Sequence, residues 1–212
     1  MDIHAIRNLA KTEEIDYLFL INSLKDYSQP RNKIQTLLKN QDLIRVKKGL
    51  YVFGERARQE PYSKEVLANL IYGPSAISLE YALAFYGLIP ERVETVTSIT
   101  NNRSKSFHTP IGNFEYCYMA TAKYSFGITQ LEIVANKYFL IATKEKALAD
   151  ILMLRTESLS NEMELQAHLV ENLRIEEFHL KELDYKAVSI LANLYGSHNV
   201  NLLQRFLENN YA

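Results

Sequence analysis

The sequence has little of what disulfide-bonded or metal-dependent small proteins need. Its single cysteine, Cys117, excludes an internal disulfide and any zinc finger built on cysteines. The five histidines show no paired spacing of the H-x-x-x-H kind. Walker A, G-x-G-x-x-G and G-x-S-x-G motifs are also missing. We therefore expect no cofactor and no bound metal.

Long apolar runs are missing as well. No stretch reaches the roughly 20 residues of a membrane-spanning helix, and the first residues lack the apolar core of a secretory signal. Together with the lone cysteine, these features lead us to expect a cytoplasmic protein without a membrane partner.

Two groups of polar residues look like fragments of a catalytic site. Ser104 and Ser106 precede His108, but a loop histidine beside hydroxyls is more often a surface group than half of a triad. Glu145 and Asp150 fall in a helix that begins near residue 144, where an acidic side chain complements the helix dipole. Neither group has a second partner, so we predict that the chain is not an enzyme. An enzyme with an unrecognised site remains an alternative.

What the sequence does have is an uneven charge distribution, which the net charge of −1 conceals. Residues 1–58 hold 11 Lys and Arg against 7 Asp and Glu, whereas residues 59–212 hold 13 against 18. Within residues 31–58 the count is 8 against 2. A basic front on a mildly acidic body indicates an anionic partner for the front. Chance unevenness in a short window is the alternative.

The basic segment predicts a helix over residues 30–39. Pro30 suits the first turn of a helix, because its missing N–H has no intrahelical acceptor there. Ile34, Leu37 and Leu38 share one apolar face, which leaves the opposite face polar.

A two-stranded ribbon follows this helix. Residues 43–46 read as a strand, Lys47-Lys48-Gly49 as a turn and residues 50–53 as the returning strand. A helix followed by a hairpin with a basic tip is typical of a winged helix, in which the helix enters the major groove of DNA. A solvated helix face and an ordinary hairpin tip are the alternative interpretation. The residues that we assign to DNA contact are Arg31, Asn32, Lys33, Gln35, Thr36, Lys39, Arg45, Lys47 and Lys48.

The predicted fold class is α+β. We expect an N-terminal winged helix-turn-helix domain over residues 1–58, and a larger α+β domain over residues 59–212 with a small, mainly antiparallel sheet and a helical tail from about residue 156. The further helices are expected near residues 3–10, 17–24, 63–72, 75–86, 144–154, 161–172, 176–194 and 198–209, with Ser78 as the N-cap in the helix over 75–86 and a break near residues 181–184 in the helix over 176–194. The strands are expected near 93–100, 114–119, 131–135 and 138–142, with a turn at residues 136–137 between the last two. The polar segment 54–61 is predicted to be a linker. A strand at 17–24 is not excluded, because that run is apolar on most sides.

A polar, partly basic loop is predicted over residues 101–110. Arg103, Lys105 and His108 could form a second basic patch that contacts phosphate on DNA or RNA. A solvated hairpin loop explains the same residues, because loops carry surface charge by default.

Several stretches together resemble one family. They are IRVKKGLYVF (44–53), ISLEYALAFYGLIPE (77–91), SITNNRSKSFHTPIGNFEYCY (98–118) and FLIATKEKALAD (139–150). In their order and spacing they resemble the AbiEi-type antitoxins, the regulator half of bacterial type IV toxin–antitoxin, or abortive-infection, systems. The resemblance covers about residues 15–155, and it lies in the succession of stretches rather than in any one motif.

The resemblance implies a function in phage defence. The family members combine a winged helix that binds double-stranded DNA at the operon's own promoter with a C-terminal domain that counteracts a nucleotidyltransferase-like toxin. We also expect a homodimer, since two winged helices on a palindrome bind more tightly than one. A protein-interaction module whose winged helix contacts protein or RNA is the alternative from another class.

Overall fold

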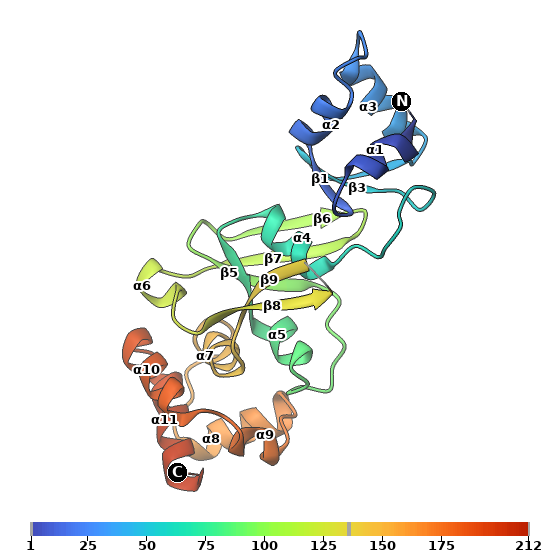
Figure 1. The fold of residues 1–212 in the computed structure, drawn as a ribbon. Coiled ribbons are helices and arrows are strands. Elements are labelled where there is room, and N and C mark those ends of the chain that lie inside the picture. The colour runs from blue at the N-terminus through green and yellow to red at the C-terminus, as the bar shows by residue number, and fades with distance from the viewer. Residues whose placement is uncertain (1, 135–136, 212) are drawn as a thin grey trace.

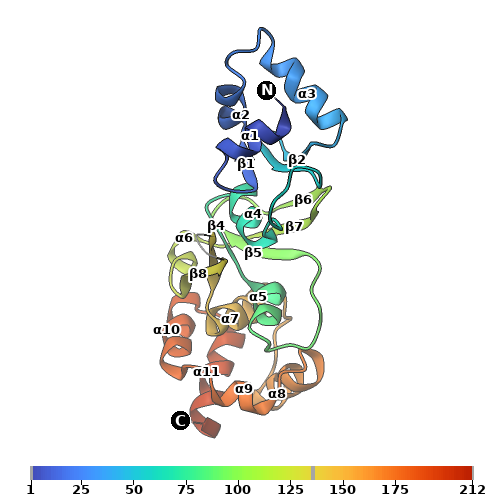
Figure 2. The ribbon, with the colours of Figure 1, turned by 45° about the vertical axis from the view of Figure 1, so that its right-hand side comes forward.

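In the computed structural model, which describes residues 2–134 and 137–211, the chain runs from a helical front unit through a central sheet to a group of C-terminal helices (Figure 1). The front unit and the C-terminal helices lie at opposite ends of the molecule, as Figure 2 also shows. The fold is α+β, as the sequence predicts.

The front unit consists of three short helices on a three-stranded antiparallel sheet with the order β1-β3-β2. Asp16 caps the second helix, because its carboxylate accepts a hydrogen bond of 2.7 Å from the Phe19 N–H. Pro30 opens the third helix, as predicted, although the N-cap residue Gln29 makes no side-chain capping bond. The first strand lies in a segment where neither a helix nor a strand is predicted. The elements are α1 (Ile3–Leu9), β1 (Glu14–Asp16), α2 (Tyr17–Ser23), α3 (Pro30–Lys39), β2 (Leu43–Lys47) and β3 (Leu50–Phe53).

Strand β3 is buried on both faces. Tyr51 and Phe53 pack with the front helices in one hydrophobic cluster, whereas Leu50 and Val52 belong to the larger cluster of the body. Since side chains alternate across a strand, the small sheet separates two cores and belongs to both. The front unit is therefore joined to the body through its sheet.

The body is built on a six-stranded mixed sheet with the order β6-β7-β5-β4-β9-β8. In Figures 1 and 2 this sheet lies between α4 on the side of the front unit and α5 and α7 on the side of the C-terminal helices. The elements are α4 (Lys64–Ile71), β4 (Ser75–Ile77), α5 (Leu79–Phe85), β5 (Val96–Thr100), β6 (Lys105–Thr109), β7 (Gly112–Tyr118), α6 (Thr121–Tyr124), β8 (Ile128–Val134), β9 (Lys137–Ala142) and α7 (Lys144–Leu154).

The six-stranded sheet is larger than predicted and mixed, although three of its five strand pairings are antiparallel. Two of the five strand pairings are parallel, β4 with β9 and β5 with β7. The parallel pairing of β5 with β7 follows from β6, which the sequence analysis treats as part of the loop 101–110. This strand forms an antiparallel hairpin with β7 and so turns β7 parallel to β5.

The helix predicted over residues 75–86 is two elements. Ser75–Ile77 form a strand between β5 and β9, and the helix begins only at Leu79, whose φ of +60° marks a sharp turn. Three residues give too short a pattern to identify a strand, because their conformation is fixed by pairing with distant neighbours. Ser78 occupies the predicted N-cap position, but its hydroxyl makes no capping bond.

The C-terminal helices follow the predicted ranges. The break expected between residues 181 and 184 separates two helices, and the helix predicted over 161–172 ends in a π-helical turn. Contacts of α10 and α11 with α7 hold this group on the body. The turn predicted at residue 136 lies outside the described residues. The elements are α8 (Glu162–Ala167), the π-helical turn η1 (His168–Asn172), α9 (Glu177–Lys181), α10 (Tyr185–Tyr195) and α11 (His198–Tyr211).

Among the described residues, none of the helices has the length and apolar character that crossing a membrane would require.

Candidate nucleic-acid interface

Helix α3 presents a polar face to solvent. Ile34 and Leu37 are buried in the front core and hold the helix against the sheet. The residues predicted for the opposite face are exposed, with one exception, Lys33, which is half-buried. Its ammonium lies 5.7 Å from the centre of the Tyr27 ring. The exposed set is Arg31, Asn32, Gln35, Thr36 and Lys39.

Three of these side chains are held by bonds within the front unit. Arg31 Nε donates to the Tyr17 hydroxyl at 3.2 Å, and the Thr36 hydroxyl donates to the Asn32 carbonyl at 3.0 Å. The Asn32 amide donates to the side-chain oxygen of Gln29. In the described part of the chain, no hydrogen bond or ion pair occupies Gln35, so its amide is available to a base edge or a phosphate.

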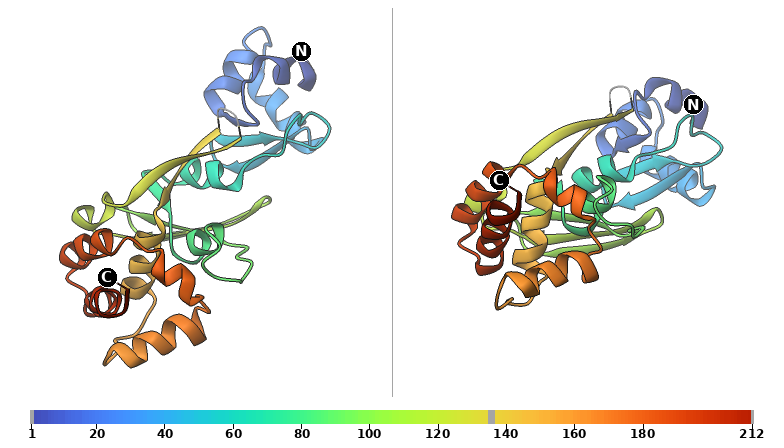
Figure 3. Two further views of the ribbon diagram at one scale, coloured as in Figure 1. Left: turned by 60° about the horizontal axis from the view of Figure 1, so that its bottom comes forward. Right: turned by 90° about the horizontal axis from the view of Figure 1, so that it is seen from below.

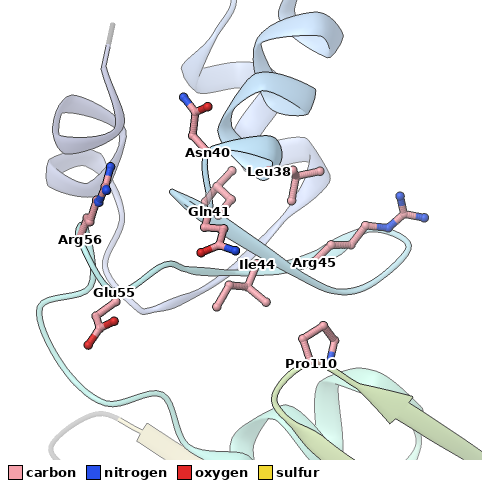
Figure 4. A pocket seen from close by; sticks show the side chains of 9 residues that line it. Leu38, Asn40, Gln41, Ile44, Arg45, Glu55, Arg56 and Pro110 are labelled. Atoms are coloured by element: carbon pink, nitrogen blue, oxygen red, sulfur yellow. The ribbon is translucent and has the colours of Figure 1, made fainter.

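The β2–β3 hairpin separates its three basic residues. Arg45 and Lys48 are exposed, and Figure 4 shows the Arg45 guanidinium reaching away from the strand. The register of β2 shifts between Arg45 and Lys47, which marks a β-bulge. A bulge redirects the side chains that follow it, so strand periodicity alone does not place Lys47.

The Lys47 ammonium binds the body. Its Nζ donates to the carbonyl of Ile71, at the C-terminal end of α4. Burial, and after it the nearby charge of Lys105, lower the pKa of Lys47. Of the predicted hairpin contacts, Arg45 and Lys48 are therefore free to reach a partner, whereas Lys47 is engaged within the protein.

The predicted second basic patch is divided between two faces of β6. Lys105 is exposed, lies 4.8 Å from the centre of the Phe107 ring, and is close enough to Lys47 to influence its pKa. His108 falls on the opposite face of the strand, since its number differs from that of Lys105 by three. Its Nδ1 lies 3.0 Å from the Asn113 side-chain oxygen. The structure thus brings Lys105 toward the hairpin and places His108 elsewhere; Arg103 is exposed in the preceding loop.

A groove of about 670 Å3 lies between the front unit and the turn that joins β6 to β7 (Figure 4). Ile44 and Pro110 line it, and Figure 4 shows Arg45 and Arg56 on opposite sides of Ile44, pointing apart. Because the guanidinium groups diverge, the groove does not form a single anion pocket. It instead marks where the body approaches the hairpin.

Two glutamates missed by the sequence analysis fix the connection to the body. The buried Glu13 carboxylate accepts hydrogen bonds from Arg7 Nη2 at 2.7 Å and from the backbone N–H groups of Gln59 and Glu60 at 3.0 and 2.9 Å. Glu14 accepts from the Ser63 N–H at 3.2 Å. The segment 54–61, which composition alone predicts to be a linker, is therefore tied down by the strand that it passes.

A second polar cluster lies sealed inside the body. The carboxylate of Asp150 accepts from the Ser78 hydroxyl at 2.6 Å, from Lys146 Nζ at 3.3 Å and from the Tyr195 hydroxyl. Burial raises the pKa of Asp150 and lowers the pKa of Lys146. Since all four side chains are buried, this cluster joins α5, α7 and α10 and offers no access to a substrate.

Within the described residues, no group of three or more His, Cys, Asp or Glu side chains is arranged to hold a metal ion. Comparison with known protein families finds no family model that matches the chain, and comparison with curated proteins finds no match either.

Proposed function

We propose that the protein is a DNA-binding transcriptional regulator. In this proposal the front unit is a winged helix, with α3 in the major groove and the β2–β3 hairpin against the neighbouring backbone. The observation that carries it is the outer face of α3, where Arg31, Gln35 and Lys39 are exposed on a helix fixed by buried Ile34 and Leu37. Arginine and glutamine are the side chains that read guanine and adenine edges.

The resemblance to the AbiEi-type antitoxins extends the proposal. On this basis the protein acts in the cytoplasm as a non-enzymatic antitoxin, represses its own promoter and counteracts a nucleotidyltransferase-like toxin. Support for this part comes from the four sequence stretches, which include the hairpin, β5 to β7 and the start of α7. No residue of the chain is assigned to toxin contact.

A second candidate is a protein- or RNA-binding module, and one observation favours its protein-binding form. Leu18 on α2 is 68% exposed and lines a shallow groove with Tyr17, Ile21 and Pro30, beside the N-terminal end of α3. An apolar groove at this place suits a protein partner better than a phosphate backbone.

Quantitative gel-shift experiments with the DNA upstream of the operon test the proposal. We expect Arg31→Ala with Gln35→Ala to weaken binding by at least about tenfold, since good base contacts are worth about 1–3 kcal/mol each. Lys186→Ala, which removes an exposed charge from α10, is the matched control and should bind like the wild type. Equal affinity of the double variant and the control for promoter DNA would refute DNA recognition by α3.

A further inference from the structure

Strand β6 runs beside the β2–β3 hairpin. It is an edge strand of the six-stranded sheet, and Figures 1 and 2 show it at the end of the body that faces the front unit. Just after its last residue, Pro110 lines the groove with Ile44 and Arg45 of β2. At its first residue, Lys105 reaches the C-terminal end of α4, where Lys47 of β2 also binds. Since both ends of β6 lie next to β2, the two strands follow each other from the groove to the hairpin turn.

Basic residues from two parts of the chain meet at the C-terminal end of α4. The Lys47 ammonium donates to the carbonyl of Ile71. The Lys105 ammonium lies 5.7 Å from the ring centre of Tyr72, the next residue, and the Tyr72 hydroxyl donates to the Arg103 carbonyl at 3.2 Å. Burial lowers the pKa of Lys47, and the charge of Lys105 lowers it further, as expected for two ammonium groups that lie close together. The body therefore places residues 103 and 105 next to the hairpin.

The positive charges at this place are not balanced by carboxylates. Lys48, Arg103 and Lys105 are exposed, and we call them the junction patch. Within residues 2–134 and 137–211, none of the three takes part in an ion pair. A concentration of positive charge without counter-charges attracts an anionic ligand, and most strongly at low ionic strength.

Two aromatic rings hold the Lys105 side chain in place. Its ammonium lies 4.8 Å from the ring centre of Phe107, and the rings of Phe107 and Tyr72 are 5.8 Å apart. Cation–π contacts position an ammonium group without neutralising its charge. A lysine held in this way loses less conformational freedom on binding a phosphate than a freely rotating one. His108 takes no part in the patch, because it lies on the opposite face of β6.

We propose that Arg103 and Lys105 bind phosphates of the DNA duplex that α3 recognises, so that the body continues the DNA contact of the hairpin. This inference rests on the proposed function, because it needs α3 in the major groove and the hairpin on the neighbouring backbone. Since β6 follows the hairpin, the DNA backbone that passes Lys48 continues over residues 103 and 105. Phosphate contacts orient a protein on DNA and carry no sequence information. The junction patch therefore adds affinity and leaves the choice of base pairs to α3.

Salt titrations of promoter-DNA binding by the full chain test the proposal. Each phosphate contact adds about 0.9 to the slope of log affinity against log salt, so we expect Arg103→Met combined with Lys105→Met to make that slope shallower by about 1.8. Between about 50 and 200 mM salt, the affinity of this variant should fall about tenfold less than that of the wild type. Its affinities for promoter DNA and for unrelated DNA should drop by the same factor, because phosphate contacts do not read sequence.

Lys186→Met combined with Arg205→Met is the matched control. It removes one lysine charge and one arginine charge from exposed positions on α10 and α11. These helices lie at the opposite end of the molecule from the front unit in both views of Figure 3. We expect the control to keep the wild-type slope. A wild-type slope for the variant at residues 103 and 105, or an equal reduction of the slope in the two double variants, would overturn the proposal.

Arg31→Ala with Gln35→Ala, measured in parallel, separates this inference from the proposed function. Loss of promoter preference in that variant, together with a wild-type salt dependence after the changes at residues 103 and 105, would refute the contact by the body alone. Wild-type binding by the variant of Arg31 and Gln35 would refute recognition by α3, and with it the DNA path on which this inference depends.

Two single variants keep the proposal testable if the double variant fails to fold. Lys105→Arg keeps a cation at this position, whereas Lys105→Met removes the charge and keeps an unbranched stem that can cover the Phe107 ring. We expect Lys105→Arg to bind with the wild-type salt dependence, and Lys105→Met to have a slope that is shallower by about 0.9. Equal slopes for these two variants would overturn the contact of Lys105 with DNA.

Discussion

The side chain of Lys47 caps the C-terminal end of α4, since its ammonium donates a hydrogen bond to the carbonyl of Ile71, the last residue of that helix. The final carbonyls of a helix lack intrahelical donors, and a cation there also complements the helix dipole. One of the three basic residues of the hairpin thus holds the front unit to the body.

Replacing Lys47 and Lys48 separately should distinguish a lysine that holds the front unit to the body from a lysine that contacts DNA. We expect Lys48→Met to weaken binding to promoter DNA and to reduce the salt dependence of binding by about one counterion, because Lys48 is exposed. Lys47→Met should leave the salt dependence unchanged and lower the free energy of unfolding by about 1 kcal/mol. Salt titrations of DNA binding and urea denaturation of both variants provide the measurements. An equal loss of salt dependence in the two variants would show that Lys47 also reaches DNA.

Glu13 should be the residue on which the connection between front unit and body depends. Glu13→Ala leaves Arg7 and two backbone N–H groups without their acceptor, so we expect a loss of about 3 kcal/mol in the free energy of unfolding. Trypsin should also cleave faster after Arg58, beside the released segment. Glu94→Ala removes a carboxylate from a solvent-exposed ion pair and should change stability by less than about 1 kcal/mol. Similar stability of the two variants would mean that the Glu13 bonds contribute little.

Substitutions at the buried pair of Lys146 and Asp150 should have non-additive effects on the free energy of unfolding. Lys146→Met leaves a buried carboxylate without its cation, and we expect a loss of about 3–5 kcal/mol in the free energy of unfolding. Adding Asp150→Leu should recover part of that loss, since an apolar pair costs less than an unpaired charge. A double-mutant cycle by urea denaturation measures the coupling. Strictly additive losses would show that the two charges do not interact.

Alkaline pH should destabilise the fold through its buried tyrosines. Burial, and after it the charge of Glu145, raise the pKa of Tyr86 to about 12, and burial also raises the pKa of Tyr116. In the unfolded chain a tyrosine ionises near pH 10. Above that value the unfolded state loses protons that the folded state keeps, so stability is full below about pH 10 and falls as the pH rises toward 12. Urea midpoints between pH 8 and 11 should show this decline in stability, and Tyr86→Phe should make the decline shallower. If the stability of the variant falls as steeply with pH as that of the wild type, groups other than Tyr86 cause the decline.

Local signals predict some elements of this fold well. Helix α7 begins and ends as expected, because Thr143 caps it with a bond to the Lys146 N–H and its apolar residues repeat at helical spacing. Strand β4 could not be predicted in the same way. It is three residues long, and its place in the sheet depends on the pairing of Ile77 with Ile141, far away in the sequence.

In the candidate interface, too, the local sequence predicts some features, whereas others depend on distant residues. Helical periodicity is sufficient to predict that Gln35 is exposed and Ile34 buried, because both follow from one helix. The direction of the Lys47 side chain depends on the bulge in β2 and on the carbonyl of Ile71, 24 residues later, and neither can be recognised from the local sequence. The hydrogen bonds of Glu13 to the linker cannot be predicted locally either, since these partners lie 46 and 47 residues away.

The burial of β3 on both faces has a practical consequence for anyone who excises the front unit. A fragment that stops at residue 58 would carry Leu50 and Val52 on an uncovered sheet surface, and it would tend to precipitate or to associate through that surface. Extending the fragment through α4 would restore the missing cover, because Leu67 and Ile71 belong to the same cluster as these two residues.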